Sequence, residues 1–259
     1  MTKSIIVLGA RDGNIGGAIA SRMDQLNDWV TVSDDCYRDD LRWAAPKYVA
    51  ADSSELGKYD ACVITLGVTD IRPFGDTNDW DIHKVIYGCL ELPLTCANNY
   101  VRGRRQCGMC GGRMMRAGSL DVCRECGANR QADGGGTIIF IGSYAHNHPL
   151  TNSTAYCAAK AGLDMACRSL AWELMPEFKV HIIHPHHVTN TPMSEKVLEC
   201  IEDTQSVSRM MAEEYTRKDL RMPNLLTADE VAAMVEFLLT VPAAAWTSGS
   251  GINMFGGSR

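Results

Sequence analysis

Short apolar runs rich in β-branched residues alternate with amphipathic stretches along most of this chain. Runs that are apolar on both faces are typical of strands in a parallel sheet that helices cover on both sides. The pattern therefore predicts an α/β fold with such a sheet at its centre. The expected strands are 5–8, 29–33, 48–51, 61–66, 136–142 and 180–184, and the expected helices are 15–26, 80–99, 155–175 and 227–239.

Length and composition exclude several classes of protein. A chain of 259 residues with 46% hydrophobic and 22% charged residues is too apolar to be disordered or fibrous, and its length favours one large domain. No apolar run approaches the ~18 residues that cross a bilayer, and the first run is too short for a signal peptide. Eleven cysteines without an export signal indicate a reducing compartment, so we expect a cytoplasmic protein.

The charge is distributed unevenly. Between Val101 and Arg130 there are seven arginines, no lysine and two acids, so this segment carries +5 while the rest of the chain carries −11. Such an abrupt boundary indicates an inserted module. We place it at residues 101–133, between a helix and the following strand, within a domain that spans 1–259.

The same segment contains two Cys-x-x-Cys-Gly units, Cys107–Cys110 and Cys123–Cys126, separated by twelve residues. Each glycine would relieve the positive φ of a tight knuckle, and four thiolates on two knuckles form a closed tetrahedral site. We predict a structural zinc ribbon, with a rubredoxin-like iron site as the alternative. So few large apolar residues cannot form a core unaided, so the metal should fold the segment.

The module enters the N-terminal end of the strand at 136–142, so it should lie far from catalytic groups, which gather at carboxyl ends. Its basic charge favours contact with an acidic partner, either another subunit or nucleic acid. A purely structural ornament fits the sequence equally well.

A glycine-rich turn, Gly9 to Gly17, lies between the first expected strand and the first helix. Its backbone can approach a dinucleotide pyrophosphate at the positive end of the helix. Candidate contacts are Gly9, Arg11, Gly13, Asn14, Ile15 and Gly16.

Asp34 and Asp35 follow the second strand, where a carboxylate accepts hydrogen bonds from the adenosine ribose and repels a 2′-phosphate. The acids favour NAD over NADP, although Arg11, Arg38 and Arg42 are placed to pair with that phosphate instead. Asp52, after the third strand, is a candidate for the adenine edge or a helix N-terminal acid.

Three residues form a candidate catalytic set. Tyr156 and Lys160 share one face of a helix at i, i+4 spacing, and Ser143 follows a buried strand 13 residues before the tyrosine. A phenol with a pKa of about 10 is a poor base at neutral pH, and a nearby ammonium lowers that pKa. Ser143 would hold the substrate oxygen while Tyr156 moves the proton.

The combination resembles the short-chain dehydrogenase/reductase family. Besides the glycine turn and the Ser-Tyr-Lys set, the matching motifs are Gly67, Ile141-Gly142-Ser143, Lys160-Ala161-Gly162, Pro185 with Thr191-Pro192-Met193, Thr247-Ser248-Gly249 and Gly256-Gly257. The resemblance covers the chain apart from the insertion. It implies a doubly wound, Rossmann-type sheet in three layers and hydride transfer between a nicotinamide cofactor and a small alcohol or carbonyl compound.

The resemblance also assigns roles to particular residues. It implies that Lys160 contacts the nicotinamide ribose and tunes Tyr156, and that residues after Pro185, here Val188 and Thr191, pack against the nicotinamide. It favours a homodimer or homotetramer.

The chain departs from the family pattern at several positions. Ala10 and Asn14 stand where the family has glycines, Thr65-Leu66 replaces Asn-Ala, and Val85 replaces the asparagine of the proton relay. His186-His187 replaces a glycine after Pro185, and Phe255 replaces an acid. These departures keep open an alternative: a catalytically weak or inactive dinucleotide-binding scaffold or sensor whose ribbon binds a partner.

Two further features surround the expected site. Segment 193–222 has apolar residues at helical spacing where the family has a substrate lid, and its methionines indicate an adaptable cover or ordinary helix packing. Five histidines gather near the carboxyl ends of two strands, as a polar pocket wall for an anionic or hydroxylated substrate or as a metal site: His146, His148, His184, His186 and His187.

Overall fold

The computed structural model describes residues 3–26, 29–33, 56–117, 120–131, 135–218 and 220–258. Within them, six strands form one sheet in the order β2-β1-β3-β7-β8-β9, and every neighbouring pair is parallel. The strands are β1 (Ser4–Leu8), β2 (Trp29–Ser33), β3 (Ala61–Ile64), β7 (Gly136–Ile141), β8 (Phe178–Pro185) and β9 (Gly251–Met254). The expected strand at 48–51 lies outside the described residues.

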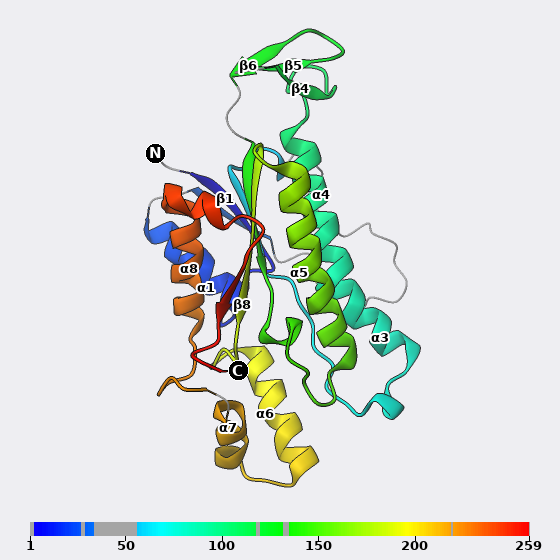
Figure 1. Ribbon diagram of the computed structural model, residues 1–259, viewed down its shortest axis with the longest axis vertical. Helices are drawn as coiled ribbons and strands as arrows, with labels where there is room; N and C mark the ends of the chain where they lie inside the picture. Colours follow the sequence, from blue (N-terminus) through cyan, green and yellow to red (C-terminus); the bar gives the residue numbers. More distant parts are fainter. Residues whose placement is uncertain are drawn as a thin grey trace.

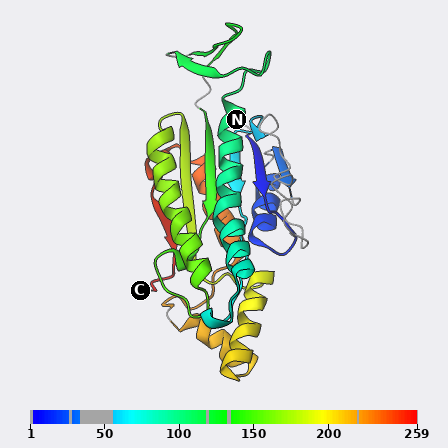
Figure 2. The ribbon, with the colours of Figure 1, turned by 90° about the vertical axis from the view of Figure 1, so that its right-hand side faces the viewer.

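Helices cover both faces of this sheet (Figures 1 and 2). On one face lie α1 (Ile15–Gln25) and α8 (Ala228–Thr240), and on the other lie α3 (Asp79–Ile86), α4 (Leu92–Arg104) and α5 (Thr154–Leu174). Successive residues of β1 enter opposite cores, since Ile5 packs with the α1–α8 core and Ile6 with the α4–α5 core. Apolar residues therefore occupy both faces of the central strands. The predicted three-layer fold is confirmed.

The expected helix at 80–99 is divided into three parts. α3 is followed by a π-helical turn, Tyr87–Glu91, before α4 continues to Arg104. Helix α4 thus runs five residues beyond the expected end, and the first residues assigned to the insertion are helical. α8 begins where expected because Thr227 and Glu230 form a capping box. Strand β9 was not among the predicted strands.

The inserted segment forms its own antiparallel sheet of β4 (Met114–Ala117), β5 (Leu120–Cys123) and β6 (Asn129–Gln131). We call residues 105–131 the ribbon. It lies at the opposite end of the molecule from α6 (Pro192–Gln205) and α7 (Arg209–Arg217), which flank the carboxyl ends of the strands (Figure 1). The ribbon is therefore remote from that edge, as expected.

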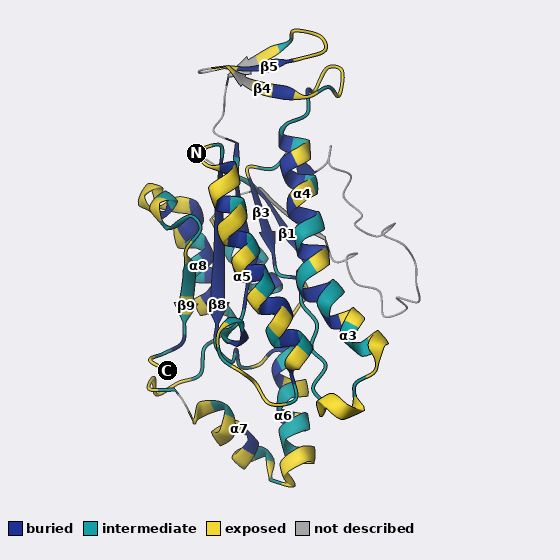
Figure 3. Ribbon diagram, turned by 45° about the vertical axis from the view of Figure 1, so that its right-hand side comes forward, coloured by how far each residue is buried: buried dark blue, intermediate teal, exposed yellow. Residues whose placement is uncertain are grey.

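Burial follows this arrangement. The central strands are buried, whereas much of α7 and of the ribbon is exposed (Figure 3). Among the described residues, no helix has both the length and the apolar character needed to span a membrane.

Candidate functional site at the carboxyl edge of the sheet

The structure brings together the three residues predicted as catalytic. Ser143 follows β7 directly, and Tyr156 and Lys160 lie on the first turns of α5. The Ser143 side chain is hydrogen-bonded to Tyr156, and Lys160 Nζ lies 5.7 Å from the centre of the Tyr156 ring. Tyr156 and Lys160 are buried, and Ser143 is half-buried. Convergence on one helix face follows from the i, i+4 spacing.

Burial dominates the electrostatics of this set. Burial raises the pKa of Tyr156, and the hydrogen bond from Ser143 opposes that rise. The lysine is itself desolvated, which lowers its pKa, and its Nζ donates to the Ile141 carbonyl at 3.0 Å. In this structure the ammonium thus also secures the end of β7.

Cys89 is a neighbour of this set that sequence reasoning missed. It lies in the π-helical turn, fully buried, and its thiol donates to the Val68 carbonyl at 3.0 Å. A Cβ on Gly67 would lie 3.5 Å from Lys160 Nζ and 3.9 Å from Cys89 Sγ, so the glycine faces both groups. Cys89 follows Val85 by one helical turn, and that spacing was the available signal. Val85 is buried beside Tyr156 with no polar group to offer.

The glycine-rich turn has the backbone that its sequence requires. Gly9 and Gly13 have φ of +86° and +77°, which glycine adopts without strain. Asn14 caps α1: its side-chain oxygen accepts from the Gly17 and Arg11 amides at 2.8 and 3.1 Å. Its amide nitrogen donates to the Gly9 carbonyl at 3.1 Å. An asparagine at a family glycine position therefore holds the turn together.

The turn also packs closely on the end of β3. A Cβ on Gly16 would lie 2.6 Å from Thr65 Oγ1, so no larger residue fits there. The first amides of α1, at Ile15 and Gly16, have no acceptor within the helix and are available to an anionic ligand. The turn therefore fits a dinucleotide pyrophosphate. Asp34, Asp35, Asp52, Arg38 and Arg42 lie outside the described residues.

The predicted nicotinamide contacts follow β8. Pro185 ends that strand, Val188 is buried, and Thr191 caps α6 by accepting from the Ser194 amide at 3.1 Å. The Thr191 hydroxyl donates to the Val188 carbonyl at 3.2 Å. The Thr191 side chain thus links the loop that follows β8 to the first turn of α6.

Four of the five predicted histidines form part of an aromatic cluster beside Ser143, whereas His187 Nε2 lies 2.8 Å from Ser194 Oγ. Tyr144 stacks on His148 with ring centres 3.9 Å apart, and His146 stacks on His184 at 3.6 Å. Ligand atoms of His146, Asp164 and His184 lie within 4.8 Å of one another. Both nitrogens of His184 already lie within hydrogen-bond distance of protein groups. The cluster consists of Tyr144, His146, His148, His184, His186 and Phe255.

The four ribbon cysteines also converge. Their sulfur atoms lie within 4.8 Å of one another, with Cys107 to Cys126 at 3.8 Å and Cys110 to Cys123 at 3.5 Å. Both knuckle glycines have positive φ, as predicted, at +73° and +71°. Hydrogen bonds from the Met109 and Cys110 amides lower the pKa of Cys107 to about 7.

Comparison with known proteins identifies the family. A family model described as enoyl-(acyl carrier protein) reductase matches residues 115–258, which is more than half of the chain. The chain belongs to the short-chain dehydrogenase/reductase family.

Sequence relatives of this dehydrogenase/reductase include two L-xylulose reductases. That of Caenorhabditis elegans is 35% identical over 125 residues, which are 47% of this chain and 45% of the relative. That of Mus musculus is 41% identical over 59 residues, 22% of this chain and 24% of the relative. The alignments span less than half of either relative.

Solved structures of the same fold cover the whole dehydrogenase/reductase chain. An actinorhodin polyketide ketoreductase variant with NADPH has a TM-score of 0.75 at 20% identity, covering 99% of this chain and 97% of that one. A sorbitol-6-phosphate 2-dehydrogenase from Erwinia amylovora has a TM-score of 0.73 at 18% identity, covering 98% of both chains. At these identities the likeness shows the fold.

The lid segment of the family corresponds here to α6 and α7. Leu198 and Ala212 are buried by helix packing, whereas Met210, Met211 and Met222 are exposed. The methionines are thus left on the surface of the segment, and the lid stays a prediction.

Proposed function

We propose that this chain is an NAD(P)-dependent oxidoreductase that transfers a hydride between a nicotinamide cofactor and a small alcohol or carbonyl compound. The observation that carries the proposal is the convergence of Ser143, Tyr156 and Lys160 at the edge that also holds the glycine turn. Residues 65–67 connect the two: Thr65 faces Gly16, and Gly67 faces Lys160. One ligand can therefore reach both the α1 N-terminus and the catalytic set.

In this proposal the cofactor, when bound, supplies or accepts the hydride, and the chain's own residues handle the oxygen and its proton. During reduction, Ser143 orients the carbonyl oxygen and the Tyr156 hydroxyl donates its proton to that oxygen. During oxidation the proton returns to Tyr156. Burial raises the pKa of Tyr156, so at neutral pH the phenol is protonated, which is the form that donates during reduction. Lys160 lies beside Gly67, where it would contact the nicotinamide ribose.

The cofactor preference, the further contact residues and the substrate class are proposed from the sequence and from the relatives. Asp34 and Asp35 favour NAD over NADP, and Asp52 is the candidate for the adenine edge. Val188 and Thr191 would line the nicotinamide side. The relatives' names suggest a ketose or polyol substrate. The eleven cysteines favour a cytoplasmic location, and the family resemblance favours a dimer or tetramer.

Replacing the phenol tests the proposal. Tyr156→Phe removes the proton donor without changing the size of the ring, so turnover should fall by about three orders of magnitude, within the range for general acid catalysis. NADH and NADPH oxidation would be followed against L-xylulose and a panel of ketoses, and cofactor binding by fluorescence. Turnover that survives in Tyr156→Phe, with binding intact, would exclude the mechanism.

The inactive scaffold is the second candidate, favoured by Val85, which provides no polar relay group beside Tyr156. It predicts tight NAD(H) binding by the wild-type chain with no oxidoreduction across the same panel. The wild-type measurement alone therefore separates an enzyme from a sensor.

We also infer that the ribbon holds a structural zinc ion in Cys107, Cys110, Cys123 and Cys126. A tetrahedral site with zinc–sulfur bonds of about 2.3 Å has sulfur atoms about 3.8 Å apart, close to the observed 3.5 and 3.8 Å. The ribbon buries only a small apolar cluster, Cys107, Met114 and Cys123, so metal ligation is the available source of stability. Iron in the same cage is the alternative.

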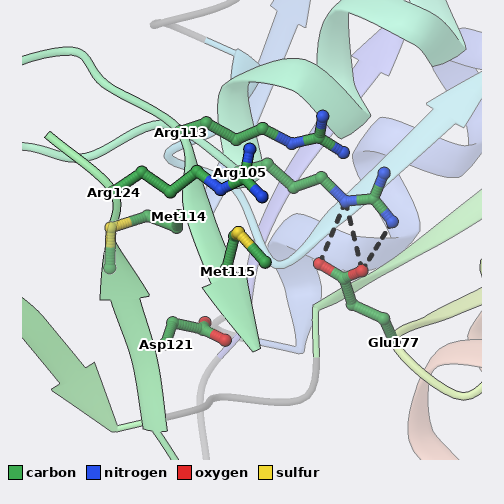
Figure 4. Close-up of a pocket in the computed structure, with 7 residues that line it drawn as sticks. All are labelled: Arg105, Arg113, Met114, Met115, Asp121, Arg124 and Glu177. Carbon is green, nitrogen blue, oxygen red and sulfur yellow. Dashed lines mark hydrogen bonds and ion pairs between the residues drawn. The ribbon is translucent and has the colours of Figure 1, made fainter. Parts of the chain in front are cut away.

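We also propose that the ribbon contacts an acidic partner. A cavity of about 260 Å³ lies between the ribbon and the sheet domain. Arg105, Arg113 and Arg124 line it together with the acids Asp121 and Glu177, and Arg105 pairs with Glu177 at 2.6 Å (Figure 4). Nucleic acid phosphate and an acidic protein both match this chemistry. Salt-dependent oligonucleotide binding that Arg113→Ser/Arg124→Ser abolishes would favour the first, and absence of binding at low salt would exclude it.

A further inference from the structure

His184 is a fully buried histidine that contacts the backbone of Ser143, and the mechanism above does not use it. It lies near the end of β8, where its ring reaches both the end of β7 and helix α5. Its Nε2 lies 3.0 Å from Asp164 Oδ1, and its Nδ1 lies 3.3 Å from the Ser143 amide nitrogen. One ring therefore joins α5 to the residue that carries the catalytic hydroxyl.

The contacts determine which nitrogen carries the proton. An ionised carboxylate only accepts hydrogen bonds, so Nε2 must donate to Asp164. The other Asp164 oxygen accepts from Arg168 at 2.9 Å. Burial keeps the pKa of His184 near 4, so the ring is neutral. Nδ1 is then unprotonated and accepts from the Ser143 amide, and its 3.2 Å approach to the Ser143 carbonyl is not a hydrogen bond.

The surrounding chain is shaped to admit this ring. A Cβ on Gly142 would lie 2.4 Å from Nδ1, and one on Gly251 would lie 2.9 Å from Nε2. His146 stacks on the ring at 3.6 Å. Gly142, directly after β7, and Gly251, at the start of β9, thus both leave room beside His184.

We propose that His184, oriented by Asp164, is a positioning residue that holds the Ser143 backbone so that its hydroxyl faces Tyr156. Ile141 and Ser143 are each held by a side chain, since Lys160 donates to the Ile141 carbonyl and His184 accepts from the Ser143 amide. The Ser143 hydroxyl also accepts from the Ala145 amide at 3.1 Å, so a shift of this backbone moves the hydroxyl. The catalytic part of this inference rests on the proposed function.

Two variants of nearly equal size separate hydrogen bonding from packing. His184→Asn keeps an acceptor close to the position of Nδ1, whereas His184→Leu has the same branched shape and no acceptor. Hydrogen–deuterium exchange of the Ser143 amide should be about tenfold faster in His184→Leu than in the wild type, and within about threefold of it in His184→Asn. Equal exchange in the two variants would overturn the proposal.

Catalysis gives the second readout. For the best substrate of the panel, kcat should fall about 10- to 100-fold in His184→Leu and be largely retained in His184→Asn, with the Kd for NADH unchanged in both. A merely structural role would weaken NADH binding and kcat together in both variants. If the wild-type chain has no turnover, the proposed function fails. Exchange of the Ser143 amide then tests by itself whether His184 holds the Ser143 backbone.

The tautomer is measurable without relying on a variant that folds poorly. Two-bond ¹⁵N–¹H spectra of the histidine-labelled chain at neutral pH should contain one buried, neutral ring protonated at Nε2, whose signal is absent from His184→Asn. An Nδ1-protonated ring or an imidazolium at this position would contradict the proposed arrangement.

Discussion

Two residues that depart from the family pattern, Asn14 and Thr65, make hydrogen bonds that stabilise the fold near the glycine-rich turn. Asn14 replaces a glycine, yet its three side-chain hydrogen bonds hold the turn that glycine would only permit. Thr65 replaces an asparagine and donates to the Leu8 carbonyl at 2.8 Å, so it still joins β3 to β1. Both replacements preserve the geometry near the cofactor turn. Val85 differs from these two residues, because it puts no polar side chain at the position where the family has the relay asparagine.

Buried histidines make the stability of the chain depend on pH. Burial, with a smaller effect from Lys179, lowers the pKa of His181 to about 4, and burial also lowers those of His184 and His187 to about 4. The unfolded chain, with histidine pKa values near 6.5, binds more protons between these limits. The free energy of unfolding should therefore fall as pH drops from about 6.5 to 4, by up to about 3 kcal/mol for each histidine.

Urea unfolding at a series of pH values checks this dependence. Because carboxylates titrate over the same range, the wild type is compared with His181→Leu. This variant removes one buried histidine from β8 and leaves the carboxylates unchanged. The variant should lose less stability than the wild type between pH 6.5 and 4. Parallel curves would show that His181 is not held neutral in the native state.

At the scale of elements, the ribbon should depend on its metal and the sheet domain should not. Cys110→Ser removes one exposed ligand, and elemental analysis should find about one zinc ion per wild-type chain and almost none in the variant. Trypsin should then cleave the arginine-rich ribbon about tenfold faster, because the opened segment lacks a core of its own.

Cys200→Ser is the matched control, since Cys200 lies on α6 at the far end of the molecule. It should keep its zinc and its resistance to trypsin. A full equivalent of zinc in Cys110→Ser would contradict the four-cysteine site, and iron in place of zinc would correct the metal.

The sequence predicted the helices and strands better than the π-helical turn that interrupts one of the helices. Strands β1, β2 and β7 and helices α1, α5 and α8 lie within a few residues of their predicted ranges, because apolar periodicity and the Thr227 cap define them. The π-helical turn was not predicted, because it changes hydrogen bonding and leaves the apolar pattern intact. For the same reason the sequence did not reveal that Cys89 lies beside Lys160.

At the candidate site, the convergence of the three predicted side chains was predictable from their spacing, and the hydrogen-bond partner of Lys160 was not. The spacing of Tyr156 and Lys160 determines that they share a helix face. The direction of the Lys160 ammonium depends on the Ile141 carbonyl, which is brought near only when β7 packs against α5. The link from His184 to Asp164 likewise joins a strand to a helix across the fold.

The whole molecule has two chemically distinct ends. The carboxyl edge of the sheet holds Ser143, Tyr156 and Lys160, together with the cofactor turn, and the opposite end holds the four cysteines and the arginine-lined cavity (Figure 1). A parallel sheet enforces this separation, because the ribbon enters at the start of β7 and the catalytic serine follows its end. Changes in the ribbon should accordingly leave the site intact.

Transfer of deuterium from the cofactor tests the central claim most directly. The wild-type chain would be incubated with C4-deuterated NADH or NADPH, of both stereochemical forms, and the ketose panel, and the products analysed by mass spectrometry. We predict an alcohol that carries one deuterium at the former carbonyl carbon, formed by the wild type and not by Tyr156→Phe. Alcohol that forms without deuterium from either stereochemical form, or labelled alcohol at the same rate from Tyr156→Phe, would contradict the account.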